Sequence, residues 1–370
     1  MTRKKEDPKN DITVLTSHSL KQNHLELSDN AIEYIAPGTF KDLDEIRVIN
    51  LYSNHLYTVQ AGTYAGLKNL EAIGLHYNRI GYISPQALRG LKKLQVLDLS
   101  YNAIEYIAPG TFKDLDEIRE IELYSNHLYT VSAGTYAGLK NLEELGLRNN
   151  RIFHISPQAL LGLKKLEVLT LSHNAIEYIA PGTFKDLDEI TYLSLYSNHL
   201  YTVSEGTFAG LKKLEAIYLH NNRISSVAAG AFEGATAAQT VYISNNNLVT
   251  IAAGTFRGLS SVTEICIDDN AISFIELGGF HGMPMINSII LAGNERLTSI
   301  DKDVFNLTEL TSTDGVSVDL GGCKLDCQCD IDWLDEAPFT TLYAHCATPP
   351  ELSTIELPSL KCVNGLMVPI

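Results

Sequence analysis

The sequence lacks several features that would assign a class of protein directly. No apolar run approaches the length of about 18 residues that a membrane-spanning helix needs. The first residues, MTRKKEDPKND, lack the apolar stretch of a secretory signal. Basic residues cluster only at Arg3, Lys4 and Lys5, and the formal net charge is −16. The composition therefore argues against a spanning segment and against the phosphate-binding surface of nucleic-acid modules.

Catalytic fingerprints are also missing. The chain has no G-x-S-x-G, H-E-x-x-H, P-loop or dinucleotide-binding motif. His76 and His220 share a repeat position but stand six repeats apart, about 30 Å at ~4.8 Å per strand, so they cannot ligate one metal ion. We therefore expect a protein that is not an enzyme and that holds no metal ion or cofactor.

What the chain does contain is one asparagine that recurs at every twenty-fourth position without insertion or deletion. An apolar pattern precedes each copy, as in Ile46, Ile49, Leu51 and Asn54. The recurring positions are Asn30, Asn54, Asn78, Asn102, Asn126, Asn150, Asn174, Asn198, Asn222, Asn246, Asn270 and Asn294. A fixed period of this kind predicts a solenoid, whose units add in one dimension and share a continuous core.

The physics behind the spacing is local. The apolar residues before each asparagine alternate as in a strand, so they point inward while the residues between them point to solvent. The chain then turns, and the asparagine side chain is suited to hydrogen-bond backbone groups that the buried turn would leave unpaired. Each such group would cost about 1–3 kcal/mol if unpaired, which explains a polar residue in an apolar interior.

Written out, the pattern L-x-x-L-x-L-x-x-N-x-L resembles the leucine-rich repeat. Further along each unit comes an aromatic or bulky apolar residue, inside phrases such as APGTFKDL and SAGTYAGL. This position resembles that of the extracellular, so-called typical, subclass of the family. Its occupants are Phe40, Tyr64, Leu88, Phe112, Tyr136, Leu160, Phe184, Phe208, Phe232, Phe256 and Phe280.

The resemblance implies an α/β solenoid. It would be a leucine-rich repeat horseshoe with a parallel β-sheet on its concave side, about twelve to thirteen 24-residue repeats, and a disulfide-bonded C-terminal cap. The family includes secreted or surface recognition proteins such as variable lymphocyte receptors, Slit-like guidance proteins and Toll-like ectodomains. The expected parts are an irregular N-terminal segment (1–21), the solenoid (22–320), the cap (321–363) and a tail (364–370).

A longer period of three repeats is superimposed on the first. The phrase NAIEYIAPGTFKDLDEI begins at Asn30, Asn102 and Asn174. Duplication of a three-repeat block and deliberate copying by an engineer both explain this period, and the sequence leaves both open.

The start of the chain departs from the family pattern. Extracellular members usually begin with a disulfide-rich cap, and no cysteine precedes the first strand here. We therefore expect Leu25 and Leu27 to lie on an uncovered edge of the solenoid.

Four cysteines near the end of the chain resemble the C-terminal flanking cap of extracellular members. From spacing alone, three pairings are possible. The resemblance implies pairing of the first with the third and the second with the fourth, that is, Cys327 with Cys346 and Cys329 with Cys362. A zinc site is the alternative, although C-x-C with distant single cysteines is poor zinc spacing. Disulfides imply an oxidising compartment, with which the glycosylation sequon at Asn306 is consistent.

Two further cysteines lie in the solenoid. Cys323 stands where an asparagine of the repeat belongs, which indicates a buried, unpaired thiol. Cys266 lies at an outward strand position, and we expect it to be an exposed thiol without a catalytic partner. We expect both to remain reduced.

The outward strand positions should form one broad face rich in tyrosine, serine, asparagine and histidine. Rigid tyrosines among small polar residues are typical of antibody-like binding surfaces. The alternative is that tyrosine is present for its strand propensity. The residues expected to bind a ligand are Tyr52, His76, Tyr124, Arg148, Tyr192, Tyr196, Tyr218, His220 and Tyr242.

The same face carries an acidic patch bordered by Arg148. Its members are Asp98, Glu120, Glu122 and Glu144. The patch could accept a basic partner or a calcium ion, and a solvated run of charge is the alternative.

The sequence thus predicts a non-enzymatic recognition protein whose concave face binds a protein or glycan ligand, in immune-type recognition or cell adhesion. An extracellular-matrix structural or matrix-binding protein is the alternative. The expected location is extracellular or on the cell surface, with no nucleic-acid partner and with membrane attachment only through a tail or anchor outside this sequence.

Overall fold

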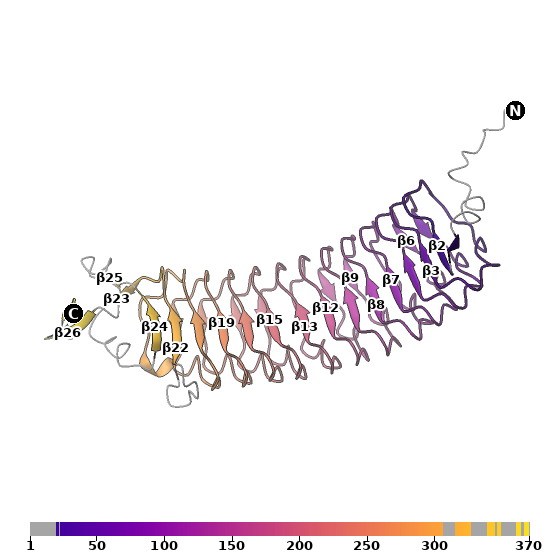
Figure 1. Ribbon diagram of the computed structural model, residues 1–370. Coiled ribbons are helices and arrows are strands. Elements are labelled where there is room, and N and C mark those ends of the chain that lie inside the picture. The colour runs from indigo at the N-terminus through magenta and orange to yellow at the C-terminus, as the bar shows by residue number, and fades with distance from the viewer. Residues whose placement is uncertain are drawn as a thin grey trace. The chain divides into compact units, whose positions relative to one another are not determined.

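The computed structural model describes residues 20–21, 23–305, 315–326, 339–344, 346–348, 360–363 and 366–369. Internal contacts divide the chain into two compact units. Unit 1 comprises residues 1–176 and 186–190, and unit 2 comprises residues 177–185 and 191–370. In each unit the backbone winds as a coil that contributes one main strand per turn (Figure 1). Within the described residues, no helix has the length and apolar character needed to cross a bilayer.

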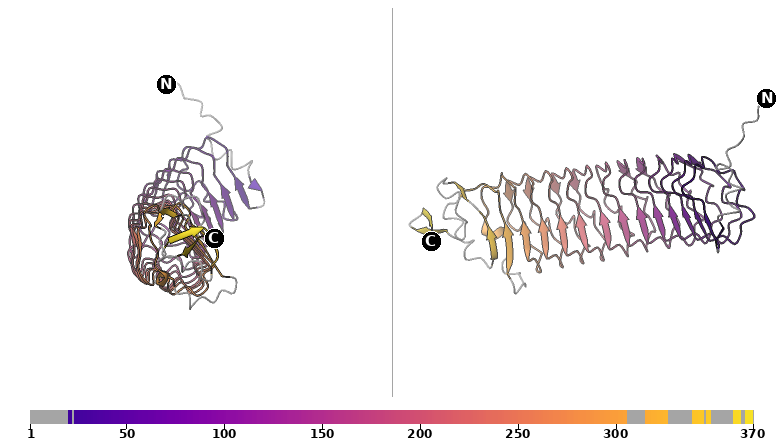
Figure 2. Two further views of the ribbon diagram at one scale, coloured as in Figure 1. Left: turned by 90° about the vertical axis from the view of Figure 1, so that its left-hand side faces the viewer. Right: turned by 45° about the horizontal axis from the view of Figure 1, so that its top comes forward.

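In unit 1 the main strands lie side by side in a parallel sheet (Figures 1 and 2). Neighbours pair in register at the spacing of one repeat, as Ile49 does with Ile73 and Ile73 with Leu97. The strands are β2 (His24–Glu26), β3 (Val48–Asn50), β5 (Ala72–Gly74), β7 (Val96–Asp98), β8 (Glu120–Glu122), β10 (Glu144–Gly146) and β12 (Val168–Thr170). The predicted strand at every turn is therefore confirmed.

The first edge of this sheet differs from the expectation. A short strand, β1 (Leu20–Lys21), pairs antiparallel with β2. The last two residues of the segment expected to be irregular (1–21) thus give partners to the backbone groups at the edge of β2. Leu25 and Leu27 are each only 1% exposed. Residues 1–19 and 22 lie outside the described residues.

Unit 2 repeats the arrangement, and Ile265 pairs with Ile289 at the same one-repeat spacing. The next repeat is longer, since Ile289 pairs with Val318. The main strands are β13 (Tyr192–Ser194), β15 (Ala216–Tyr218), β17 (Thr240–Tyr242), β19 (Glu264–Cys266), β21 (Ser288–Ile290), β22 (Val316–Asp319) and β24 (Phe339–Tyr343).

One strand of the segment predicted as a C-terminal cap, β24, extends this sheet. β24 pairs parallel with β22, with a shift of register after Val316. The remaining elements are the short helix η2 (Lys302–Val304), the parallel pair β23 (Leu325–Asp326) and β25 (Cys346–Thr348), and the antiparallel pair β26 (Leu360–Val363) and β27 (Leu366–Pro369). Cys327, Cys329, Asn306 and the side chains of Cys346 and Cys362 lie outside the described residues, so the disulfide pairing and the glycosylation site stay predictions.

A second wall of each unit, which we call the flank, follows the asparagine of each turn and carries pairs of two-residue strands. In unit 1 these are β4 (Thr58–Val59) with β6 (Tyr82–Ile83), and β9 (Thr130–Val131) with β11 (His154–Ile155). In unit 2 they are β14 (Thr202–Val203) with β16 (Ser226–Val227), and β18 (Thr250–Ile251) with β20 (Phe274–Ile275).

The core of each turn lies between these walls and contains the predicted leucines and aromatic residues. All the bulky residues predicted at one position per repeat, from Phe40 to Phe280, are at most 4% exposed. Their rings stack from turn to turn, with centroids 5.8 Å apart for Phe112 and Tyr136 and 5.6 Å apart for Phe256 and Phe280. Within each unit the apolar repeat therefore forms a continuous core, since each turn buries its apolar side against the next.

The recurring asparagine holds successive turns together. Asn54 Nδ2 donates to the carbonyl oxygens of Leu51 in its own turn (3.1 Å) and Leu27 in the preceding turn (2.8 Å). Its Oδ1 accepts from the backbone N–H of Ile32 (3.0 Å). The same three kinds of contact recur at Asn78, Asn102, Asn126, Asn150, Asn174, Asn222, Asn246, Asn270 and Asn294. The predicted role of this residue is confirmed.

Cys323 occupies the asparagine position of the stretched repeat. Its Sγ donates to the carbonyl oxygen of Leu291 at 3.4 Å, the counterpart of the bond that each asparagine makes to the preceding turn. The thiol is buried and free, as predicted. Burial, the largest cause, raises its pKa to about 11.

From Asn30 to Asn270, the residue just before each recurring asparagine has a left-handed backbone, with φ between 50° and 57°, and the glycine before Asn294 has φ 75°. This conformation costs a non-glycine residue about 1 kcal/mol. It turns the chain out of the main strand toward the flank, and its side chain adds a further column beside the strand. The column consists of Asp29, Ser53, Tyr77, Tyr101, Ser125, Asn149, His173, Ser197, Asn221, Asn245 and Asp269.

Candidate functional site

The candidate site is the outer surface of the main strands, which we call the strand face. Each turn presents the first and third residues of its main strand, the residue two positions further on, and the left-handed residue that follows. Because neighbouring strands pair in register, each of these positions forms a column within a unit. The chemistry of the face can therefore be described column by column.

In unit 1 the face carries a chain of aromatic contacts, the unit 1 array. Tyr52 stacks on His76 with ring centroids 4.8 Å apart, and His76 meets Tyr77 edge-on at 5.6 Å. Tyr77 then stacks on Tyr101 at 4.3 Å, and Tyr101 meets Tyr124 edge-on at 5.2 Å. The structure thus brings the predicted Tyr52, His76 and Tyr124 into one continuous array.

Tyr77 and Tyr101 were missed by the sequence reasoning. They lie in the left-handed column, which a strand-only interpretation treats as part of a turn. Their position in the repeat, directly before Asn78 and Asn102, was the signal that could have identified them. Tyr77 is 53% exposed and Tyr101 is 40% exposed, and the side-chain hydrogen bond between them is the largest cause that raises the pKa of Tyr77.

Unit 2 carries a second aromatic cluster, the unit 2 array, made entirely of predicted residues. Tyr218 lies between Tyr192 and Tyr242, with centroids 5.4 Å and 5.3 Å away. Tyr196 stacks on His220 at 4.7 Å, and His220 meets both Tyr218 and Tyr242 edge-on. All five rings are half-buried, and burial is the largest cause that raises the pKa of Tyr218 and of Tyr242. Such packing holds the side chains in fixed positions.

The acidic patch lies on adjacent strands of unit 1, as predicted. Glu120 pairs in register with Glu144, and Glu122 pairs with Asp98 on one side and Gly146 on the other. The Glu122 carboxyl lies over Gly146, in the space that a larger side chain there would take. Burial first, then Glu144, Glu120 and Asp98, raise the pKa of Glu122 to about 8. The carboxyl is therefore mainly protonated at neutral pH, unlike that of a solvated charge run.

A second carboxyl group of the patch, that of Asp98, is held by its neighbours. Its Oδ1 accepts from the backbone N–H and the hydroxyl of Ser100, at 2.9 and 2.6 Å. Its Oδ2 lies 2.9 Å from Nδ1 of His76. Among the described residues, no group of three or more His, Cys, Asp and Glu side chains is arranged to hold a metal ion.

Cys266 corrects one expectation. We expected an exposed thiol, and the residue is only 7% exposed. It lies in register between Tyr242 and Ile290, whose larger side chains flank it on both neighbouring strands. Burial, the largest cause, raises the pKa of its thiol to about 12. The thiol is free, as predicted.

A hollow of about 420 Å³ opens on the strand face of unit 1. Its lining consists of Tyr101, Tyr124, Ser125, Arg148, Asn149 and His173. Of these, the sequence identified Tyr124 and Arg148, and the other four belong to the left-handed column. Burial, and then the charge of Arg148, lower the pKa of His173, so its imidazole is neutral at pH 7.

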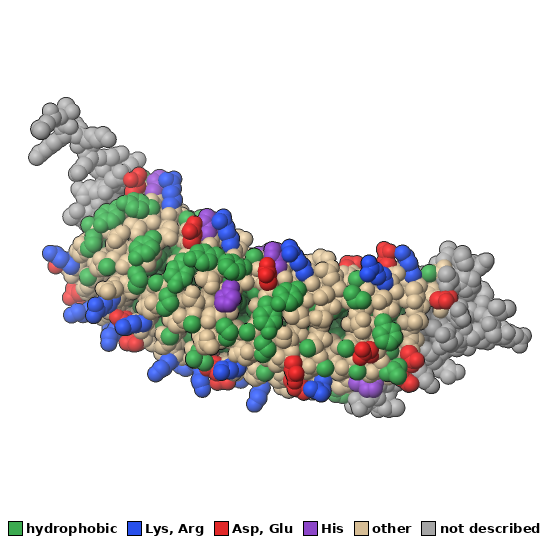
Figure 3. Space-filling model, turned by 180° about the vertical axis from the view of Figure 1, so that it is seen from behind, with side chains coloured by type: hydrophobic (Ala, Val, Ile, Leu, Met, Phe, Trp, Pro, Cys, Tyr) green, Lys and Arg blue, Asp and Glu red, His purple; other side chains and the backbone are tan. Residues whose placement is uncertain are grey.

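The flank carries exposed aromatic residues that the sequence reasoning did not single out. Tyr106, Tyr129 and Phe153 stack at 6.1 and 6.4 Å in unit 1, and Tyr178 stacks on Tyr201 at 6.1 Å in unit 2. Figure 3 shows hydrophobic side chains, tyrosines included, gathered between charged edges. The residues, 39–57% exposed, are Tyr34, Tyr57, Tyr82, Tyr106, Tyr129, Phe153, Tyr178, Tyr201, Val249 and Phe274. Exposed apolar residues in a row are a common mark of interaction surfaces.

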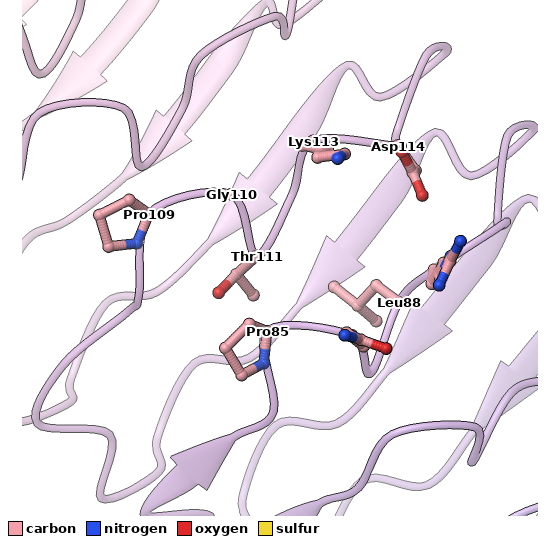
Figure 4. A pocket seen from close by; sticks show the side chains of 9 residues that line it. Pro85, Leu88, Pro109, Gly110, Thr111, Lys113 and Asp114 are labelled. Carbon is pink, nitrogen blue, oxygen red and sulfur yellow. The ribbon is translucent and has the colours of Figure 1, made fainter.

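A second hollow, of about 380 Å³, lies between two adjacent turns of unit 1 in the stretch before the main strands (Figure 4). Pro85, Pro109 and Thr111 line it together with Lys113 and Asp114. It brings together none of the residues predicted to bind a ligand.

Comparison with known families identifies the repeat. The family described as "Leucine rich repeat" matches residues 23–80, 47–104, 68–128, 94–152, 140–200, 191–239 and 236–295. This stretch corresponds to about 11 turns, somewhat fewer than the twelve to thirteen repeats expected. No curated protein matches the chain with significance.

Solved structures share the fold at low identity. A chain of the TLR13–ssRNA13 complex is 22% identical with a TM-score of 0.66, and the match covers 88% of this chain and 52% of that one. A chain of the Drosophila Toll–Spatzle complex is 19% identical with a TM-score of 0.65, and the match covers 93% of this chain and 58% of that one. A chain of the complex of Latrophilin 3, Unc5D and FLRT2 is 22% identical with a TM-score of 0.57, and the match covers 90% of this chain and 87% of that one. The chain thus spans about half the length of the first of these proteins. At these identities the likeness shows the fold alone.

Proposed function

The chain belongs to the leucine-rich repeat family, whose solenoids are generally non-catalytic binding scaffolds, and we propose that it is a recognition protein that binds a protein or glycan ligand through its strand face. The observation that carries this proposal is the pair of aromatic arrays, one on the strand face of each unit. Stacked and half-buried rings lose little conformational freedom when a partner docks on them, which is why such residues dominate binding energy at interfaces.

The positions of two aromatic rings also argue against the alternative that tyrosine is present only for its strand propensity. Propensity alone accounts for tyrosines in strands, but Tyr77 and Tyr101 lie outside the main strands in the left-handed column. A tyrosine in that conformation carries a backbone cost rather than a gain. Both nevertheless stack within the unit 1 array, which supports selection for a surface rather than for a strand.

Charge limits the class of partner. The formal net charge of −16 and the acidic patch repel a phosphate backbone, so the proposal includes no nucleic-acid partner. The structural neighbours include complexes with RNA and with the proteins Spatzle and Latrophilin 3. Four clustered cysteines support a site of action outside the cell or at its surface, in an oxidising compartment.

An extracellular-matrix role is the second candidate, and the flank favours it. Its exposed rings recur from turn to turn, and a row of this kind can pack along an extended partner such as a fibre. The two candidates use different walls of the same turns, so one set of variants separates them.

The test compares two tyrosines of unit 2. Tyr218 is half-buried at the centre of the unit 2 array, whereas Tyr201 is 51% exposed on the flank. A glycan array and a panel of immobilised protein ectodomains serve as probes for the full chain. For a probe that binds, Tyr218→Ala is expected to cost about 2 kcal/mol, or roughly 30-fold in affinity, while Tyr201→Ala leaves the affinity within about twofold.

The opposite result would assign binding to the flank and favour the matrix role. Equal losses from both variants would indicate a change in folding, which circular dichroism and the midpoint of thermal unfolding detect. Loss from neither would place recognition away from both tyrosine rows of unit 2.

A further inference from the structure

The hollow on the strand face of unit 1 coincides with a break in the three-repeat period. Tyr52 and Tyr196 are equivalent to Tyr124, because each lies one block of three repeats away. In both equivalents a histidine stacks on the tyrosine ring, at 4.8 Å for His76 and 4.7 Å for His220.

Arg148 takes the place of that histidine in the block that contains the hollow. In the first block, Tyr77 stacks on Tyr101 beside the histidine, and Asn149 takes the place of Tyr77 in the second block. Two substitutions in one repeat therefore remove two rings from the strand face. The space that rings occupy in the first block opens as the hollow in the second.

The guanidinium of Arg148 has no ion-pair or hydrogen-bond partner among the described residues. Other arginines do, as Arg47 pairs with Glu71 at 2.9 Å and Arg119 with Glu143 at 3.2 Å. Because His173 is neutral at pH 7, Arg148 is the charged group of the lining. An arginine side chain offers a planar set of N–H donors that matches a carboxylate.

The rest of the lining is aromatic and polar. Tyr101 and Tyr124 meet at an interplanar angle of 83°, so they form a corner into which a ring fits. Asn149 Nδ2 donates to Ser125 Oγ at 2.9 Å, which orients the amide and leaves its Oδ1 as an acceptor. The hollow thus offers a corner for a ring, one cation, and several hydroxyl and amide groups. Its volume falls within the range of small-ligand sites.

We propose that this hollow binds an acidic sugar, that is, a monosaccharide unit bearing a carboxylate, as part of a glycan ligand of the strand face. This proposal rests on the proposed function and names the ligand class for unit 1. The carboxylate pairs with Arg148, the sugar ring lies against the tyrosine corner, and the hydroxyls use the amide and hydroxyl groups of the lining.

Two alternatives fit less well. A polyanion would place further charges over Asp98, Glu120 and Glu144 on the neighbouring strands of the same unit, where repulsion opposes binding. An acidic side chain of a protein would satisfy Arg148, but it is narrow and carries no hydroxyls. It would leave the amide and hydroxyl groups of the hollow without partners.

The test is calorimetric titration of the full chain with methyl glucuronide, and with methyl glucoside as the uncharged equivalent. The expected result is binding of the glucuronide, with the glucoside at least about 10-fold weaker. Arg148→His should abolish this preference, because it restores the residue found in the equivalent blocks and closes the space over Tyr124. Since that histidine is native at the equivalent positions, the variant should fold.

Arg119→Gln serves as the control, because Arg119 is an exposed arginine of the same unit that pairs with Glu143. It should leave glucuronide affinity unchanged. Equal binding of the two glycosides, or glucuronide binding that survives Arg148→His, would overturn the proposal. So would tighter binding of an acetylated glutamate peptide, which would assign the hollow to a protein partner. No binding at millimolar concentration would also overturn it, while the Tyr218→Ala comparison in unit 2 would still test the proposed function separately.

Discussion

Three neighbouring main strands of unit 1 and their equivalents in unit 2, six repeats later, carry opposite chemistry on the same backbone. The third strand residues are Asp98, Glu122 and Gly146 in unit 1, and Tyr242, Cys266 and Ile290 in unit 2. Glu122 and Cys266 occupy equivalent positions, and burial is the largest cause that raises the pKa of each. The repeat therefore fixes where a side chain lies, whereas the residue decides what the face can bind.

The largest expected effect tests whether the backbone is indeed equivalent in the two units. Asn126 and Asn270 lie six repeats apart and make the same contacts, each donating to the carbonyl oxygens of two turns. Asn126→Ala and Asn270→Ala should each cost about 2–4 kcal/mol in unfolding free energy, since each leaves buried groups unpaired. Urea unfolding measures both. A large loss from only one of the two variants would mean that the recurring asparagine does not stabilise the two units equally.

A smaller effect distinguishes the units by pH. The pKa of Glu122 is raised from its ordinary 4.5 to about 8, so the folded state holds this proton more tightly than the unfolded state. Its stabilising contribution is complete below pH 4.5 and is lost as the pH rises through about 8. The loss should be about 1–2 kcal/mol, because solvent screens a half-buried group.

Glu122→Gln tests this linkage, because glutamine keeps the shape and cannot ionise. Unfolding free energies of the wild type and the variant should converge at low pH and separate by pH 9. Cys266→Ser at the equivalent position of unit 2 is the control, and it should leave the slope between pH 5 and 8 unchanged. Parallel curves for the wild type and Glu122→Gln would contradict the prediction.

The packing of Glu122 over Gly146 predicts a further effect of at most about 1 kcal/mol. A Cβ at residue 146 would meet the Glu122 carboxyl, which is the end of a flexible side chain and can move aside. Gly146→Ala should therefore shift the pKa of Glu122 downward, as the carboxyl becomes more exposed, while stability changes little. Carbon-13 NMR of the carboxyl follows this pKa. Gly74→Ala, where the nearest atom is Asn50 Oδ1 at 3.3 Å, is the control.

The smallest expected effect is that the thiols of Cys266 and Cys323 do not react with an alkylating reagent in the native protein. Burial keeps the Cys266 thiol protonated, with a pKa of about 12, and only the thiolate is nucleophilic. Native protein at pH 8 should therefore leave Cys266 and Cys323 unlabelled by iodoacetamide, while urea-unfolded protein should label both. Mass spectrometry of peptides reads the result. Rapid labelling of Cys266 in the native state would show that the neighbouring strands do not cover it.

Much of the fold could be predicted because the repeat links each residue to one local task. The 24-residue period of the asparagine predicted the position of every main strand through β21. It also predicted which asparagines hold successive turns together. The alternation around Leu51 identified the core side of the strand, and the bulky position identified Phe112 and its equivalents as buried. These assignments rest on short-range geometry, in which strand alternation and turn hydrogen bonds leave few alternatives.

The candidate site was predictable only in part. Strand alternation located Tyr218 and Tyr242 on the outer face, and the unit 2 array formed as expected. It could not locate Tyr77 and Tyr101, because a left-handed residue departs from strand alternation. It also misjudged Cys266, because the exposure of an outward residue depends on the size of its neighbours on adjacent strands.

The sequence by itself therefore determined the repeat, the register and the identity of the core, since each follows from contacts within one turn or between neighbouring turns. Only the tertiary structure decided which outward groups are buried, neutral or available. Glu122 is mainly protonated because it is buried beside three other carboxyls and packs over Gly146, and Arg148 is available because its guanidinium forms no ion pair within the described residues. These properties depend on side chains from several turns packed on one face, and desolvation and charge act through space rather than along the chain.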